Sequence, residues 1–322
     1  MLIRLIWKQV APVIDLLLIP FVAISACILK VYRRGSPRMP MNTAVLKKIG
    51  IFPVRDHYYE PLFNDRHLSR SLREKRNLPG LDFRLEEQRE LLGRLVYQQE
   101  FDDFCREQSS AGGSHGFSID NGSFESGDAE FLFNLLRYLK PKRVIEIGCG
   151  SSTRIISQAL KLNSSKDARQ ARHTCIEPYE QPWLSELGGI ELIRKKVEDC
   201  GIRWQAELQD GDLLFIDSSH VIRPQGDVLH EYLEIIPKLS SGVYVHVHDI
   251  FTPRDYPDDW LRNKVLFWNE QYLLEATLSN NTSYRIVASL NYLKHEEYEG
   301  LRKVCTYLTP QREPGSFYFR IN

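Results

Sequence analysis

The hydrophobic and polar positions of this chain change their spacing along its length, and each spacing predicts a different kind of element. From residue 128 onward, short runs of branched apolar residues alternate with stretches in which apolar residues recur every three or four positions. This alternation is typical of an α/β domain whose doubly wound, mostly parallel sheet carries helices on both faces. We therefore predict a sheet of seven strands, preceded by an N-terminal helical extension.

The same pattern gives approximate bounds for the elements. Strands are expected at 143–147, 173–177, 190–194, 212–217, 242–249, 284–290 and 316–321. Helices are expected at 85–105, 128–139, 151–162, 225–239 and 260–278, and residues 35–80 are expected to be irregular. We divide the chain into an N-terminal anchor (1–34), a connector with a helical lid (35–127) and the α/β domain (128–322).

An apolar segment near the N-terminus is long enough to interact with a membrane. Sixteen of the twenty residues in 10–29 are apolar, and about 20 such residues cross the hydrocarbon core of a bilayer. Pro12, Asp15 and Pro20 interrupt the segment, so a helix in the membrane plane or a re-entrant anchor is an alternative to a spanning helix. A cleaved signal peptide or a lipoprotein-like site at 24–27 is a further alternative.

Basic residues are distributed unequally around this segment. Arg4 and Lys8 precede it, whereas Lys30, Arg33, Arg34 and Arg38 follow it. By the positive-inside rule, this asymmetry predicts that the rest of the chain lies on the cytoplasmic side of a membrane.

Composition excludes one broad class of partner. Lysine plus arginine equals aspartate plus glutamate at 42 each, so the chain has no general positive field with which to bind nucleic acid. The six cysteines are scattered without Cys-x-x-Cys or zinc-type spacing, which predicts reduced and mostly buried thiols. Composition does not indicate an oligomeric state.

The sequence VIEIGCGSST at 144–153 places an acid and two glycines where the first strand ends. Gly148 and Gly150 fit a dinucleotide-binding turn, but Thr153 stands where that turn has its third glycine. The pattern resembles motif I of the Rossmann-like S-adenosylmethionine-dependent methyltransferases. The resemblance implies that the glycines admit the methionine part of the cofactor and that Glu146 helps to hold its ammonium group.

Acids after the next two strands extend this resemblance. Glu177 ends the second strand, where a carboxylate can accept hydrogen bonds from ribose hydroxyls. Glu198 and Asp199 follow the third, where methyltransferases of this type place an acidic contact to the adenine amine, and we choose Asp199. The expected cofactor-binding residues are Glu146, Gly148, Gly150, Ser151, Glu177 and Asp199.

The fourth and fifth strands both end in aspartate. Asp217 and Asp249 should emerge at one edge of the sheet, where two carboxylates need a proton or a cation between them. Mg²⁺ or another hard divalent ion would supply the charge.

The spacing from Asp217 to His220 is similar to that of metal-dependent sugar O-methyltransferases and of cephalosporin-hydroxylase-like proteins, over about residues 125 to 255. The resemblance implies that the first Asp and a later acidic pair bind metal, while His220 acts as the base. His248 stands where those enzymes have Glu, so the implied metal ligands are Asp217, His248 and Asp249. His246, deeper in the same strand, is expected to be structural.

Together these features predict a membrane-associated O-methyltransferase that acts on a hydroxyl of a small molecule or glycan. Arg254 and Tyr256, after the fifth strand, are candidates for contact with that acceptor. Two alternatives are a nicotinamide-dependent oxidoreductase and a catalytically silent nucleoside-binding partner in a membrane glycan pathway.

Overall fold

The computed structural model describes residues 2–110, 116–167, 171–179 and 181–322. The chain forms two compact units, Met1–Arg70 and Ser71–Asn322. They are described separately below.

The first unit is built around one long helix. Helix α1 (Leu2–Gly35) contains both Pro12 and Pro20, and its part within Val10–Arg38 is long and apolar enough to cross a membrane. A short 3₁₀ turn η1 (Ser36–Arg38) leads into helix α2 (Pro40–Ile49), and a second 3₁₀ turn, η2 (Asp65–His67), follows. The prediction that 35–80 is irregular was therefore wrong at α2. Proline at its first position favours that helix, and Gly50 ends it in the left-handed conformation.

The second unit contains a seven-stranded sheet in the order β3-β2-β1-β4-β5-β7-β6. Only β7 runs antiparallel to its neighbours, which confirms the predicted doubly wound, mostly parallel fold. The order reverses direction on either side of β1, which creates a switch point between β1 and β4. The strands are β1 (Arg143–Ile147), β2 (Arg172–Ile176), β3 (Ile190–Ile193), β4 (Leu213–Ile216), β5 (Tyr244–Val247), β6 (Tyr284–Ser289) and β7 (Phe317–Ile321).

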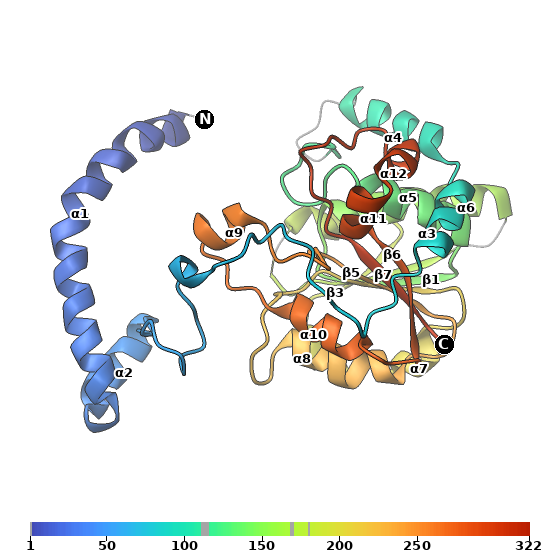
Figure 1. The fold of residues 1–322 in the computed structure, drawn as a ribbon. Coiled ribbons are helices and arrows are strands. Elements are labelled where there is room, and N and C mark those ends of the chain that lie inside the picture. The colour runs from blue at the N-terminus through green and yellow to red at the C-terminus, as the bar shows by residue number, and fades with distance from the viewer. Residues whose placement is uncertain (1, 111–115, 168–170, 180) are drawn as a thin grey trace. The chain divides into compact units, whose positions relative to one another are not determined.

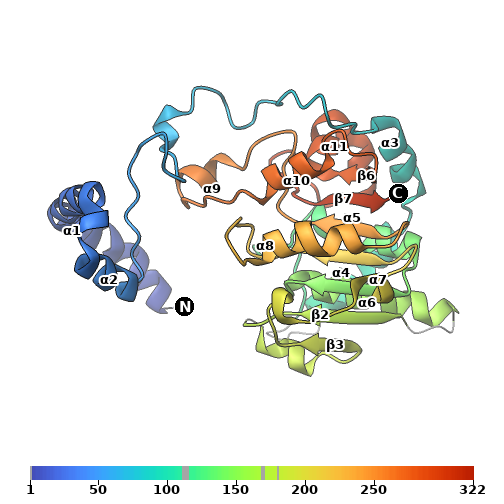
Figure 2. The same ribbon diagram turned by 90° about the horizontal axis from the view of Figure 1, so that it is seen from below.

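Helices cover both faces of the sheet (Figure 1; Figure 2). One face carries α3 (Leu85–Arg94), α4 (Gln98–Ser110), α5 (Asp128–Leu139), α6 (Ser151–Asp167), α11 (Leu290–Glu296) and α12 (Tyr298–Val304). The other carries α7 (Trp204–Glu207), a helical segment that starts with α8 (Asp227–His230) and continues through 231–238, and α10 (Glu270–Leu278). The short helix α9 (Asp258–Arg262) lies in the connection before α10.

The second unit has two hydrophobic cores, one on each face of the sheet, because side chains alternate between the faces along each strand. In β4, Leu213 and Phe215 pack with the α5 and α6 face, whereas Leu214 and Ile216 pack with the α8 and α10 face. All four side chains are fully buried. Such strands are apolar throughout because helices cover both sides of the sheet.

Two helices that we predicted as continuous are interrupted. The predicted helix 85–105 stops at Arg94 and restarts at Gln98, because Leu95 is extended and the backbone amide of Tyr97 donates to the side chain of Asn134 (2.8 Å). The predicted helix 260–278 is divided into α9 and α10. The residues between these two helices reach the functional site described next.

Candidate active site

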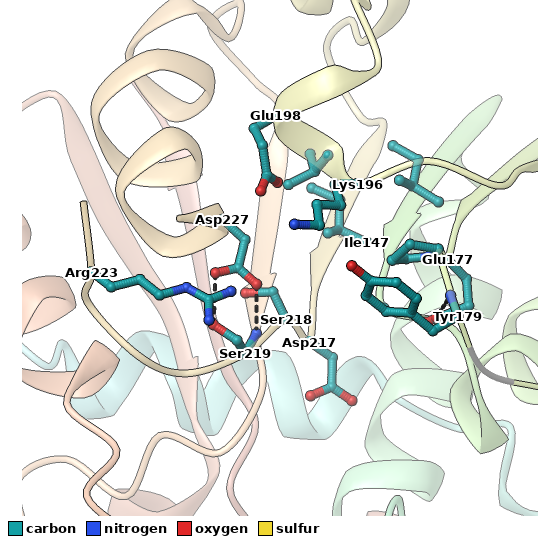
Figure 3. A pocket seen from close by; sticks show the side chains of 14 residues that line it. Ile147, Glu177, Tyr179, Lys196, Glu198, Asp217, Ser218, Ser219, Arg223 and Asp227 are labelled. Carbon is teal, nitrogen blue, oxygen red and sulfur yellow. Dashed lines mark hydrogen bonds between the residues drawn. The ribbon is translucent and has the colours of Figure 1, made fainter. Parts of the chain in front are cut away.

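The carboxyl ends of the central strands surround a cavity of about 420 Å³ at the switch point. Figure 3 shows Glu177 and Tyr179 on one side of this cavity and Ser219, Arg223 and Asp227 on the other. The cavity is lined by Ile147, Gly148, Ile176, Glu177, Pro178, Tyr179, Lys196, Val197, Glu198, Asp217, Ser218, Ser219, Arg223 and Asp227. Ligands of doubly wound folds bind at this position because the loops diverge there.

The two glycines after β1 occupy different surroundings. Gly148 has a φ of +77°, and a Cβ added to it would lie 1.8 Å from the carbonyl oxygen of Asp217. Gly148 is therefore required by the close approach of the β1 and β4 ends. Gly150 does not line the cavity, but a Cβ on it would meet no protein atom within 4 Å, so the space beside it is open.

Glu146 lies beneath this turn and does not line the cavity. It is fully buried, accepts a hydrogen bond from Ser152 Oγ (2.6 Å) and contacts His173 Nε2 at 2.9 Å. Burial disfavours a charge on His173, but hydrogen bonds with Cys175 and Glu146 outweigh it and raise the pKa of His173 to about 9. Glu146 thus holds β1, β2 and the start of α6 together.

The acids after β2 and β3 approach the cavity in part. Glu177 lines it, and its carboxylate accepts from the backbone amides of Cys149 (3.2 Å) and Tyr179 (2.9 Å). Glu198 also lines the cavity, whereas Asp199, in the same 3₁₀ turn η4 (Val197–Asp199), does not. Ser151 begins α6 outside the cavity lining, and its hydroxyl is 3.4 Å from that of Ser123.

Next to the cavity, three side chains converge around one imidazole. His220 Nε2 lies 3.2 Å from Asp217 Oδ1 and 3.6 Å from Asp249 Oδ2, while its Nδ1 lies 2.8 Å from Glu270 Oε2. The side chains of His220 and Glu270 are buried, and that of Asp217 keeps 29% of its exposure on the cavity side. His220 and Asp249 have φ values of +60° and +57°, a conformation that few non-glycine residues adopt.

The charges of this cluster are strongly coupled. Burial disfavours a charged His220, yet its hydrogen bonds to Asp217 and Glu270 outweigh that cost and raise its pKa well above the ordinary value. Burial opposes a charged Asp217 too, but the neighbouring His248 and His220 lower its pKa. Burial raises the pKa of Asp249, and His248 and His220 offset this only in part. Without a further cation, His248 and His220 therefore balance the charge of the two aspartates together.

The donor atoms of Asp217, His220 and Asp249 lie within 4.8 Å of one another, as the ligands of one metal ion would. His248, which we expected in this set, lies at its edge, with Nε2 3.4 Å from Asp249 Oδ1. His246 is fully buried, stacks on Phe215 at 4.0 Å and contacts Ser316 Oγ at 3.0 Å. These contacts give His246 a structural environment.

Sequence reasoning missed three residues of the cluster, all between α9 and α10 or at the start of α10. The backbone amides of Asn269 and Glu270 donate to the carbonyl oxygen of His220 (3.0 and 3.2 Å), and Asn269 Oδ1 accepts from the amide of Ile222. The ring of Trp268 lies 4.3 Å from that of His220. The sequence offers one signal for them: the Asn-Glu pair at 269–270, which is typical of the start of a helix. We did not recognise it because the predicted helix 260–278 runs through these positions.

The two residues expected to contact an acceptor are both buried. Arg254 donates from Nε to the carbonyl oxygen of Arg73 (3.1 Å), and the hydroxyl of Tyr256 accepts from the backbone amide of Gln271 (3.1 Å). These bonds hold the loop after β5 against neighbouring segments.

Residues 145–250 match the model of a methyltransferase domain family. This segment is about a third of the chain, and it includes the cavity and the cluster up to Asp249. The match supports a methyltransferase.

The chain is also similar to a curated relative and to two solved structures. A protein of Archaeoglobus fulgidus, described as uncharacterized, is 26% identical over 181 residues, which are 52% of this chain and 78% of the relative. A solved structure from Plasmodium falciparum, described as a protein-L-isoaspartate O-methyltransferase in complex with S-adenosyl-L-homocysteine, is 15% identical with a TM-score of 0.24. The similarity covers 37% of this chain and 56% of that protein, so the chain spans little more than half of its length. A structure from Thermobifida fusca, described as a methyltransferase, is 10% identical with a TM-score of 0.36, over 76% of this chain and 96% of that one.

Proposed function

We propose that this protein is an S-adenosylmethionine-dependent O-methyltransferase that acts on a hydroxyl group of a small molecule or glycan. The observation that carries the proposal is the continuity of the cavity with the cluster: Asp217 lines the cavity and also contacts His220. A ligand in the cavity would therefore lie beside a buried imidazole. The methyltransferase domain match over 145–250 supports the same assignment.

The contacts to the nucleoside part of the cofactor follow from the lining of the cavity. Glu177 would accept hydrogen bonds from the ribose hydroxyls, and Glu198 would contact the adenine amine, a role that the sequence predicted for Asp199. The open space at Gly150 would admit the methionine part, while Glu146 would act from below by holding the turn in place.

Methyl transfer to a hydroxyl group requires a base. Bound S-adenosylmethionine would supply a methyl group on a sulfonium. As the acceptor oxygen forms the new C–O bond, the C–S bond would break and its electrons would return to sulfur. A neutral hydroxyl is a poor nucleophile, so His220 Nε2 would take its proton. Glu270 would keep the ring in place by accepting the hydrogen bond of Nδ1–H.

The residues of the cluster also fit a divalent cation. Asp217 and Asp249 would hold it, with His248 at the edge of the site, and carboxylate donors of this kind suit Mg²⁺. Such an ion would stabilise the developing alkoxide and would offset Asp217 and Asp249, two of the three carboxylates that raise the pKa of His220. His220 could then act as a base near neutral pH.

The cellular setting is part of the proposal. Helix α1 would attach the enzyme to a membrane, and the basic residues that follow its apolar segment 10–29 would keep the second unit on the cytoplasmic side. The alternative of a nicotinamide-dependent oxidoreductase is not favoured by the domain match. A silent nucleoside-binding partner would share the cavity and differ only in activity.

Calorimetric titration separates these functions. We expect S-adenosylhomocysteine to bind the purified chain and NAD not to bind, since the turn after β1 has Thr153 in place of the third glycine. Transfer of labelled methyl groups to a panel of hydroxylated acceptors would then distinguish an enzyme from a silent partner. Binding of NAD in preference to S-adenosylhomocysteine would contradict the proposal.

A further inference from the structure

Helix α2 leaves an apolar face uncovered. Met41, Val45 and Ile49 are four positions apart, so they lie on one face of the helix, and they keep 82%, 56% and 64% of their exposure. Thr43 belongs to the opposite face, and its hydroxyl is 2.7 Å from that of Tyr32 in α1. The contact joins the start of α2 to the end of α1 without covering the apolar face.

The apolar surface continues beyond the helix. Gly50 ends α2 in the left-handed conformation, and Ile51 and Phe52 follow with 47% and 69% exposure. Single exposed apolar residues are common on proteins, but five large ones within twelve residues form a patch that calls for a partner.

The charge around this patch has one sign. No aspartate or glutamate occurs between Asp15 and Asp56, and the interval contains seven basic residues: Lys30, Arg33, Arg34, Arg38, Lys47, Lys48 and Arg55. Two of them, Arg33 and Arg55, bind Glu60 at 2.9 and 3.1 Å. Among the described residues, the other five form no ion pair, and Lys47 and Lys48 lie in the last turn of α2.

We propose that α2 lies in the headgroup region of an anionic lipid surface, with Met41, Val45 and Ile49 inserted and Lys47 and Lys48 at the lipid phosphates. A basic helix with one apolar face is the form of an interfacial membrane helix. The inference rests on the proposed membrane attachment through α1, because that attachment brings α2 to the surface. Charge complementarity favours anionic lipid over a protein partner, because the only charged residues in the segment around the patch, 16–55, are basic and the patch follows the apolar helix.

Hydrogen–deuterium exchange of the full chain in lipid nanodiscs tests this inference. The discs would contain phosphatidylcholine alone or phosphatidylcholine mixed with phosphatidylserine, and peptides that cover 40–49 would be followed by mass spectrometry. We expect exchange of α2 to be roughly ten- to thirtyfold slower with phosphatidylserine, the factor that two basic residues near an anionic surface supply. High salt should reduce the difference.

Two double variants separate insertion from general effects of charge. Val45→Glu with Ile49→Glu should abolish the protection, and both positions are exposed, so the change removes no buried contact. Val96→Glu with Leu233→Glu makes the same change at two exposed apolar positions of the second unit, at 68% and 63% exposure, and should leave the protection intact. A second test, Lys47→Ala with Lys48→Ala, should remove the dependence on phosphatidylserine.

The outcomes distinguish this inference from the attachment on which it rests. If the chain stays in the discs while α2 exchanges equally fast in both lipids, α1 attaches the protein but the role of α2 is overturned. That result would point to a protein partner for the apolar face. If the chain does not enter the discs at all, the membrane attachment itself fails.

Discussion

Glu270 and His220 are fifty positions apart in the sequence, yet the carboxylate Oε2 of Glu270 lies 2.8 Å from Nδ1 of His220. Both side chains are buried, and the backbone amide of Glu270 also donates to the carbonyl oxygen of His220 (3.2 Å). The start of α10 therefore fixes both the ring and the main chain of the residue that we propose as the base.

Replacement of Glu270 by Gln should lower the rate of methyl transfer roughly 10–100-fold, the usual effect of losing a partner that orients a functional side chain. Affinity for S-adenosylhomocysteine should not change, because Glu270 does not line the cavity. Single-turnover rates and calorimetry measure the two effects. The exposed Glu299→Gln is the control, and equal rates for both variants would contradict a positioning role.

His220→Ala should reduce the rate roughly 10²–10⁴-fold, the contribution of a positioned base. The deficit should shrink as the pH rises, because the acceptor hydroxyl then ionises without help. A pH–rate profile of both proteins measures this. A deficit that is constant across pH would argue that His220 has only a structural role.

Chelation of divalent cations should stop methyl transfer and leave cofactor binding intact, because Asp217 and Asp249 face the cluster while Glu177 and Glu198 lie on other walls of the cavity. His248→Glu adds a carboxylate at the edge of the same site and should retain activity with Mg²⁺. Activity assays after exhaustive chelation, with elemental analysis of the protein, provide the measurement. Full activity in a metal-free sample would reject the metal role.

The glycines after β1 should respond differently to the same substitution. Gly150→Ala should leave the melting temperature unchanged and weaken cofactor binding, because its Cβ would meet only the proposed ligand. Gly148→Ala should destabilise the fold, because its Cβ would collide with the carbonyl oxygen of Asp217. Gly188→Ala, also in open space but outside the turn after β1, is the control. Unchanged affinity in Gly150→Ala would remove this turn from the proposed site.

The buried pair of His173 and Glu146 should make stability depend on pH. The pKa of His173 is raised to about 9 in the folded chain, from an ordinary value of 6.5, so the folded state binds more protons between these values. Its contribution is complete below pH 6.5 and is lost as the pH rises through 9, with a slope of at most about 1.4 kcal/mol per pH unit. Urea unfolding of the chain across this range should show the loss. His173→Gln should flatten the curve and the exposed His57→Gln should not, whereas parallel curves for wild type and His173→Gln would contradict the assignment.

The sequence determined the sheet and the general position of the site. Short apolar runs such as 213–216 are typical of strands buried on both faces, and the residues that follow such strands in a parallel sheet must meet at one edge. For this reason Gly148, Glu177, Asp217 and Asp249 could be assigned to one region from their positions in the chain. The alternation of side chains along β1 also predicts the face on which Glu146 lies. Its neighbours Ile145 and Ile147 pack on one face of the sheet, so Glu146 must point to the other.

Only the tertiary structure decided which side chains line the cavity and which contact His220. The rotation of one 3₁₀ turn directs Glu198 rather than Asp199 to the cavity, and no local pattern specifies that rotation. Glu270 reaches His220 because the chain between α9 and α10 departs from the helix that its apolar spacing predicts. Local preferences of a few tenths of a kcal/mol per residue determine an element, but contacts between distant segments determine its ends and its neighbours. Those contacts exist only once the chain has folded.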